Sequence, residues 1–310
     1  MLESLPVSGL RSQVSDEPSR LAEPDWLARR EAHERRVRVW TDPHQTRQAR
    51  GEKHPVEDFL FEYYRFRPSW LRRWHPGPDV VLQGAAAREY LRWPEYRECD
   101  GGIALNAAAF DPSRRDTLTW LRSLLKATAE RPPQFGCFGL HEWAMIYRQA
   151  PDEVRHSAWP LRFPAEEIAR IVEAQPVRCS HFDAFRFFTP AARPLNRQQP
   201  ERATVAEFEQ RGCLHANMDL YKWAFKLAPF TPSELVADCF TLARDIREID
   251  MRASPYDFRA LGYEPVAIET PAGRTEYEIH QRAFAERSQP LRKQLLDVVE
   301  RLISRTAHGA

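Results

Sequence analysis

The sequence predicts a mainly α-helical protein, with at most a small sheet that would make it α+β. Apolar residues recur at helical spacing over long segments. One such stripe consists of Leu235, Val236, Cys239, Leu242, Ile246 and Ile249. Prolines stand near the expected helix starts, and runs typical of strands are short, as at residues 80–82 and 103–105. The chain is therefore expected to form one multi-helix globular domain.

The composition limits the class of protein. At 310 residues, 43% hydrophobic and 29% charged, the chain can bury a sizeable core and is typical of a soluble protein. No apolar run approaches the roughly 20 residues that span a bilayer, and no export signal is recognisable at the N-terminus. Five cysteines without CxxC spacing favour a reducing cytoplasm. A net charge of +1 neither requires nor excludes an anionic partner.

The first half of the chain is expected to be helical after a tail. Residues 1–22 lack apolar periodicity and are predicted to be disordered, whereas residues 23–310 form the domain, with a sub-boundary near 131–135 as the alternative. The expected elements are a helix from Asp25 to about residue 40, short helices after Pro43 and Pro55, and a helix over 111–130.

The second half is also expected to be mostly helical, with brief strands. Helices are predicted over 142–149, 165–174, 217–227, 232–252 and 275–304, the last bent or broken at Pro290. Strands are predicted over 159–163, 177–180 and 266–269. In the helix over 232–252, Asp238, Asp245 and Asp250 are expected on faces other than the buried stripe.

Three separate segments carry Cys, His, an acid and aromatic residues. They are RCSHFDAFRFFTPAARPLN at 178–196, GCLHANMDLYKWAFKL at 212–227 and FGCFGLHEWAMIYR at 135–148. Ionisable groups among so many aromatics are rarely buried without partners. We therefore expect the three segments to meet in one pocket.

The acids and histidines of these segments are the candidate catalytic residues. Burial and neighbouring imidazoles can tune the pKa of a carboxylate, which suits acid–base chemistry. The candidates are Asp183, Asp219, Glu142, His181, His215 and His141. The structural alternative is that each acid bonds a helix N-terminus or an arginine.

The aromatic and amide residues of the same segments are candidates for binding a flat, polar ring by stacking and cation–π attraction. The predicted substrate-binding residues are Trp143, Tyr147, Phe185, Arg186, Asn217, Tyr221, Lys222 and Trp223. The alternative is that the aromatic residues belong to the core.

Several known active-site motifs are missing from the chain. There is no GxxxxGK[ST] loop, GxGxxG or GxSxG motif, and Met145 stands where an HExxH motif starting at His141 needs its second histidine. Metal-ligand spacings such as CxxC, HxxxH and ExxH are also missing from the three Cys/His segments. We therefore expect no cofactor, with a Zn or Fe ion held by His141, His181, His215 and nearby acids or thiols as the alternative.

Arginines near the N-terminus are candidates for contacting phosphates. They are Arg29, Arg30, Arg35, Arg36, Arg72 and Arg73. Because glutamates are interleaved with them, a solvated helix face is the alternative.

The chain resembles a group of bacterial proteins, from actinobacteria and proteobacteria, that are known as 3-methyladenine DNA glycosylases. The resemblance rests on the three segments above, on HPVEDFLFEYYRFRP at 54–68 and on residues 234–257, and it covers most of residues 25–290. It implies an N-glycosylase that removes alkylated purines from DNA. No catalytic residue transfers by motif, because the chain lacks the Gly-rich hairpin of helix-hairpin-helix glycosylases.

The resemblance and the residue chemistry give one main function and two alternatives. In the glycosylase, Asp183 or Asp219, or else Glu142, would stabilise the sugar cation, with a histidine to position the acid or protonate the base. DNA would then be the partner. The first alternative is a small-molecule enzyme, such as a metal-dependent hydrolase or oxygenase, that uses the same pocket. The second is a non-catalytic binding protein.

Overall fold

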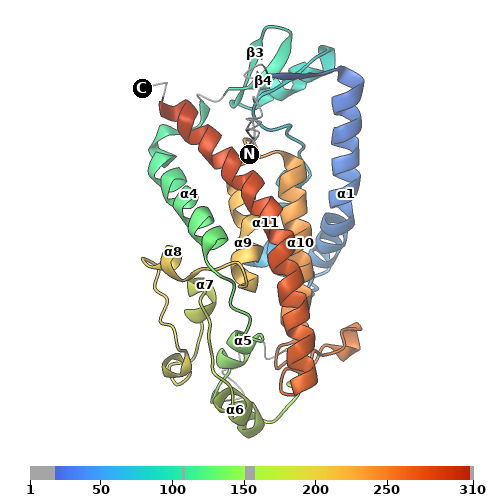
Figure 1. The fold of residues 1–310 in the computed structure, drawn as a ribbon. Coiled ribbons are helices and arrows are strands. Elements are labelled where there is room, and N and C mark those ends of the chain that lie inside the picture. The colour runs from blue at the N-terminus through green and yellow to red at the C-terminus, as the bar shows by residue number, and fades with distance from the viewer. Residues whose placement is uncertain (1–17, 107–108, 151–157, 308–310) are drawn as a thin grey trace, which may run out of the picture.

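Long helices form the body of the protein, as predicted (Figure 1). The computed structural model describes residues 18–106, 109–150 and 158–307. Its body is made of α1 (Glu23–Ala49), α4 (Arg115–Glu130), α9 (Leu214–Lys226), α10 (Ser233–Arg252) and α11 (Pro271–Ala307). The paired helices α9 and α10 lie at the centre, where α11 packs against both of them and against α4. No described helix is long and apolar enough to cross a membrane.

Two prolines lie inside long helices that the sequence predicted to be interrupted. Pro43 is part of α1, and Pro290 is part of α11, which continues past it to Ala307. Tertiary packing explains the continuity around Pro290. Arg292 is 1% exposed and donates to the Asn217 side chain on α9 at 2.6 Å, and Leu295 is fully buried. These contacts hold α11 in place directly after Pro290, where one backbone hydrogen bond is lost.

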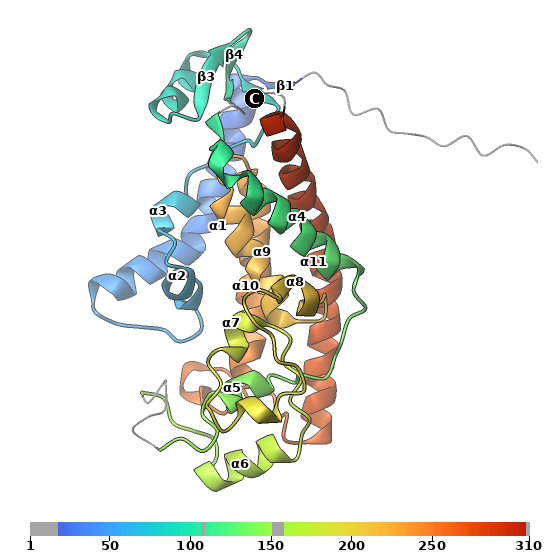
Figure 2. The same ribbon diagram turned by 90° about the vertical axis from the view of Figure 1, so that its left-hand side faces the viewer.

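A four-stranded sheet caps one end of the bundle (Figures 1 and 2). Its order is β1 (Ser19–Leu21), β2 (Val80–Leu82), β4 (Gly102–Leu105) and β3 (Tyr96–Cys99), with β1 parallel to β2 and the other pairs antiparallel. The 3-10 helix η1 (Ala85–Arg92) packs beside it. Residues 19–21 are thus a strand, because the backbone of β2 satisfies their hydrogen bonds, and the predicted tail was too long. Residues 1–17 lie outside the described part of the chain.

Short elements cover the other end of the bundle and the side of α10. They are α2 (Phe59–Tyr64), α3 (Pro68–Leu71), η3 (Pro112–Arg114), α5 (Leu140–Ala144), α6 (Ala165–Glu173), α7 (Phe182–Phe185), η4 (Arg193–Leu195), α8 (Val205–Phe208) and η5 (Arg259–Leu261). The helix predicted over 142–149 is only the single turn of α5 followed by turns. The strands predicted over 159–163 and 177–180 are isolated bridges, and residues 266–269 form no strand.

The connection between α9 and α10 positions the candidate site. Because only residues 227–232 join them, the two helices pack side by side and the first turn of α9 lies near the last turns of α10. The segments that carry α5 and α7 lie at this end of the pair (Figure 2).

Candidate functional site

Three histidines meet where the three Cys/His segments converge. His141 lies on α5, His181 precedes α7, and His215 lies in the first turn of α9. The ring of His215 is 4.5 Å from that of His141 and 5.2 Å from that of His181, centroid to centroid. His141 and His181 are buried and His215 is half-buried. The predicted meeting of the three segments is therefore present in the structure.

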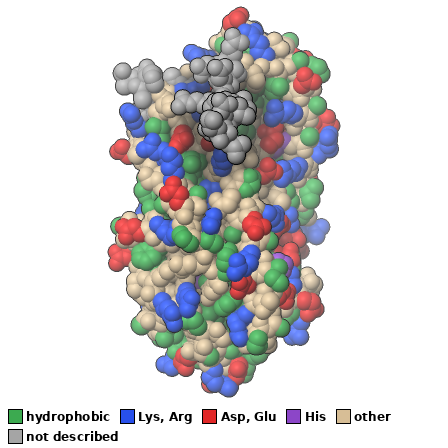
Figure 3. Space-filling model, in the orientation of Figure 1, with side chains coloured by type: hydrophobic (Ala, Val, Ile, Leu, Met, Phe, Trp, Pro, Cys, Tyr) green, Lys and Arg blue, Asp and Glu red, His purple; other side chains and the backbone are tan. Residues whose placement is uncertain are grey.

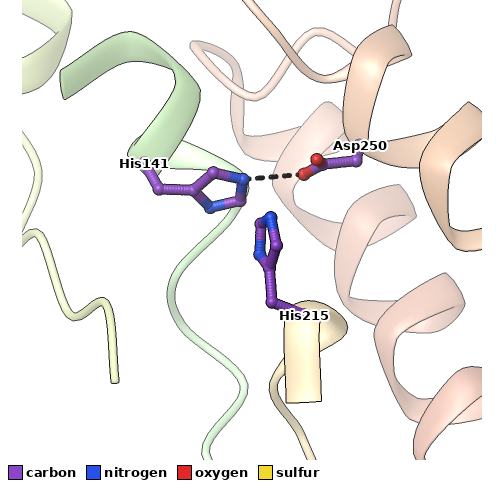
Figure 4. A group of neighbouring side chains, drawn as sticks. All are labelled: His141, His215 and Asp250. Atoms are coloured by element: carbon purple, nitrogen blue, oxygen red, sulfur yellow. Dashed lines mark ion pairs between the residues drawn. The ribbon is translucent and has the colours of Figure 1, made fainter. Parts of the chain in front are cut away.

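His141, His215 and Asp250 form a compact triad (Figure 4). One potential ligand atom from each residue lies within 4.8 Å of the other two. His141 Nε2 forms an ion pair with Asp250 Oδ1 at 2.9 Å, and neither buried atom has an aligned hydrogen-bonding partner among the described residues. Two ligand atoms bound to one ion at about 2.1 Å and at right angles would be about 3.0 Å apart. The His141–Asp250 pair thus has the spacing of two ligands of one metal ion, and the ligand atom of His215 lies within 4.8 Å of both.

Asp250 and Arg247 set the charges around the triad. Burial alone would lower the pKa of His141, but the Asp250 carboxylate outweighs it and raises that pKa. The pKa of His215 is lowered by burial and by the neighbouring His141, so its imidazole is neutral. Arg247 Nη1 lies 3.4 Å from Asp250 Oδ2 and 3.2 Å from Glu142 Oε1. Arg247 therefore holds the second carboxylate oxygen and leaves Oδ1 facing the imidazoles.

Asp250 was missing from the predicted site. The sequence analysis placed it away from the buried stripe of α10, whereas the structure buries it completely. Asp238 and Asp245, by contrast, keep 45% and 40% of their side-chain surface exposed. The helical spacing in α10 does indicate that Asp250 is buried, because Asp250 follows the buried Ile246 by four residues and therefore lies on the same face of the helix.

A second cluster lies beside the first. His181 Nε2 is 3.4 Å from both Glu209 Oε1 and Asp219 Oδ2. Lys222 forms an ion pair with Asp219 Oδ2, and the Tyr64 hydroxyl donates to Asp219 Oδ1 at 2.7 Å. Burial alone would raise the pKa of Asp219, but Lys222 and His181 lower it far below its usual range. Because an ammonium group already neutralises Asp219, this cluster is better described as a buried ion-pair network.

Three hollows surround the histidines. A cavity of about 190 Å³ has His141 and His215 in its wall together with Cys137, Cys179 and Cys213. A cavity of about 70 Å³ is lined by His215, Glu142, Asp183 and Arg247, among others. An open cleft of about 570 Å³ is lined by residues that include His181, Asp183, Asp219, Lys222 and Trp223.

The predicted substrate-binding residues divide between the cleft and the core. Arg186, Lys222 and Trp223 line the cleft. Trp143 and Tyr221 are fully buried, and Tyr147 donates its hydroxyl hydrogen bond to Glu173. Phe185 and Asn217 are also buried, and none of these five residues lines the three hollows.

The arginines predicted to contact phosphates are engaged with other side chains. Arg29 pairs with Glu234, Arg30 with Glu89, Arg35 with Glu31, Arg36 with Asp238 and Arg72 with Asp42. Arg73 lies over the rings of Trp70 and Trp93. On the face seen in Figure 3, basic and acidic side chains are interspersed.

Comparisons of the sequence and the structure with family models, curated proteins and solved structures gave no significant match. The geometry of the site is therefore the basis for a functional assignment, and the family resemblance of the sequence stays a prediction.

Proposed function

We propose that this protein is a metal-dependent enzyme that acts on a small molecule, with His141, His215 and Asp250 as the metal ligands. The proposal rests on the close grouping of three ligand atoms: His141 Nε2 pairs with Asp250 Oδ1 at 2.9 Å, and a ring nitrogen of His215 lies within 4.8 Å of both residues' ligand atoms. Neither His141 Nε2 nor Asp250 Oδ1 has an aligned hydrogen-bonding partner among the described residues. Two imidazoles and one carboxylate suit first-row metals such as Fe²⁺ and Zn²⁺. Three protein ligands also leave coordination positions open for water or substrate.

The dimensions of the site favour a small substrate. The two hollows that reach His215 measure about 190 and 70 Å³. A bound metal would act there as a Lewis acid or activate water or dioxygen, as in a hydrolase or an oxygenase. The residues of the chain would keep the ligands in place. Arg247 orients Asp250, and Glu142, which faces the smaller cavity, is the group placed to accept or donate a proton.

Metal analysis of the purified protein tests the proposal. We expect about one Fe or Zn per chain by elemental analysis and loss of that metal in Asp250→Asn. Asp245→Asn is the matched control, because Asp245 lies on the same helix and pairs with Arg287 at its surface. A wild-type protein that binds no first-row metal, even after incubation with Fe²⁺ or Zn²⁺, would contradict the proposal.

The DNA glycosylase activity implied by the resemblance is the second candidate. The observation that favours it is the 570 Å³ cleft, where Asp183 and Asp219 lie beside Trp223 and the cations Lys222 and Arg186. Abasic-site formation in alkylated duplex DNA tests this candidate. It requires release of free base by the wild type and loss of release in Asp183→Asn or Asp219→Asn, and wild-type protein that releases no base excludes it.

A further inference from the structure

The 190 Å³ cavity differs from the 70 Å³ cavity and the 570 Å³ cleft in the charged residues of its wall. Among the described residues, its wall contains one arginine, Arg178, and no Asp or Glu. The smaller cavity contains Glu142 and Asp183, and the open cleft contains three carboxylates. A concave site with a guanidinium and no carboxylate in its wall attracts anions.

Arg178 is free to bind a ligand. It has no ion pair or hydrogen bond with any residue that the structure describes. Its Nη1 lies 3.8 Å from the place that a Cβ at Gly136 would occupy, so the guanidinium lies against bare backbone in the cavity wall. A guanidinium without a protein partner can donate its N–H groups to a carboxylate or another oxyanion in the cavity.

The start of α9 adds a second attraction for an anion. Cys213, the N-cap residue, makes no side-chain capping hydrogen bond, and Cys213, Leu214 and His215 line the cavity. The first N–H groups of this 13-residue helix and its dipole favour negative charge. His141, whose Nε2 pairs with Asp250, is part of the same wall and places the proposed metal site beside the cavity.

The remaining wall limits the size and polarity of the ligand. A cavity of roughly 150 Å³ accommodates benzene, so 190 Å³ suits about ten non-hydrogen atoms and excludes a nucleotide. Cys137, Cys179 and Cys213 form an apolar part of the wall. Burial raises the pKa of the Cys179 thiol to about 12 and also raises the pKa values of the other two thiols, so all three are uncharged at neutral pH.

We propose that this cavity binds a small organic carboxylate, with the carboxylate held by Arg178 and the N-terminus of α9 and a short apolar body among the three cysteines. This inference rests on the proposed function, because it treats the carboxylate as the substrate of the metal-dependent enzyme. A ligand held in this way would extend toward His141 and His215. The end opposite its carboxylate would then lie at the metal.

Calorimetric titration with benzoate and with the neutral benzamide tests the proposal. Benzoate should bind wild-type protein at least tenfold more tightly than benzamide, and Arg178→Met should remove most of that preference. Arg148→Met is the matched control, since Arg148 is exposed and pairs with Glu173 outside the cavity. Equal binding of benzoate and benzamide, or unchanged benzoate binding by Arg178→Met, would overturn the proposal.

Two further measurements complete the experiment. A titration with phosphate distinguishes a carboxylate ligand from an inorganic anion, and metal analysis tests the two proposals separately. Inorganic phosphate that binds through Arg178 while benzoate does not would overturn the choice of a carboxylate. Metal content is measured on the same samples and should be unchanged in Arg178→Met. Metal without Arg178-dependent benzoate binding rejects the carboxylate site alone. Arg178-dependent benzoate binding without metal rejects the proposed function alone.

Discussion

The Asp58 carboxylate is buried beside α1, where the Arg47 guanidinium, the His44 ring and a backbone N–H hold it. His44 Nδ1 and Arg47 Nη2 lie 2.8 and 2.6 Å from Asp58 Oδ1, and the His54 backbone N–H donates to Oδ2 at 2.8 Å. Burial by itself would raise the pKa of Asp58, but the hydrogen bonds from Arg47 and His44 lower it below the usual value. The ionised form is therefore the one that stabilises the fold.

Replacing Asp58 gives a pH-dependent change in stability. Asp58→Asn should lower the free energy of unfolding by about 2 kcal/mol at pH 7, because the charged partner of Arg47 is lost. The unfolded carboxyl titrates near pH 3.9, so the stabilisation is complete above that pH and disappears as pH falls through the lower folded pKa. Denaturant titrations from pH 3 to 7 should show the difference shrinking toward acid. A difference that is constant with pH would contradict this account.

Lys222 neutralises the buried Asp219 carboxylate of the second histidine cluster. Its ammonium group pairs with Asp219, which is 4% exposed, and only 14% of the Lys222 side chain is exposed. Lys222→Met should lower the free energy of unfolding by about 3 kcal/mol, because it leaves a buried carboxylate without its cation. Chemical denaturation measures the loss. Lys293→Met is the control, since Lys293 is exposed and should change stability by less than about 0.5 kcal/mol.

At the scale of elements, α11 carries an internal proline that its packing tolerates. A proline inside a helix costs about 3 kcal/mol relative to a residue that completes the hydrogen bond. Pro290→Ala should therefore raise the free energy of unfolding by about 1 kcal/mol or more. Pro271→Ala should have little effect, because Pro271 is the first residue of the helix. A loss of stability in Pro290→Ala would show that the proline ring itself is needed for packing.

The elements also show what local sequence can predict. The stripe from Leu235 to Ile249 predicted α10 correctly, because the apolar period alone defines a buried helix face. Pro43 predicted the start of a new helix, whereas α1 continues through it, because partners far along the chain stabilise α1. Pro290 predicted a bend or a break, and α11 is unbroken there but changes direction near its middle (Figure 1). The bridge between Leu161 and Tyr256 and the bridge between Val177 and Asn196 do not extend into strands. A short window of sequence determines neither the continuity of these helices nor the length of these strands, because both depend on distant partners.

At the scale of the whole molecule, the candidate site depends on long-range packing. The repeated Cys and His residues predicted that three segments converge, and the rings of His141, His181 and His215 do lie together. The spacing of α10 indicates that Asp250 is buried, but it does not indicate that Asp250 joins the histidines, because this helix lacks the Cys/His pattern of the three segments. The antiparallel pairing of α9 and α10 brings it to His215.

A metal at this position would join α5, α9 and α10, and its removal should weaken the fold. At a free-metal concentration about 100 times the dissociation constant, binding contributes about 2.7 kcal/mol to stability. A chelator should therefore lower the melting temperature of the wild type, and added Fe²⁺ or Zn²⁺ should restore it. Asp250→Asn should show no response to either treatment. An equal response in Asp250→Asn would place the stabilising metal elsewhere.

The most direct test of the metal site is an anomalous difference map from crystals of metal-loaded protein, recorded at the absorption edge of the bound metal. The account predicts one strong peak about 2.0–2.2 Å from a ring nitrogen of His141, a ring nitrogen of His215 and Asp250 Oδ1. A map without a peak between these three side chains, or with its only strong peak at the His181, Glu209 and Asp219 cluster, would contradict it.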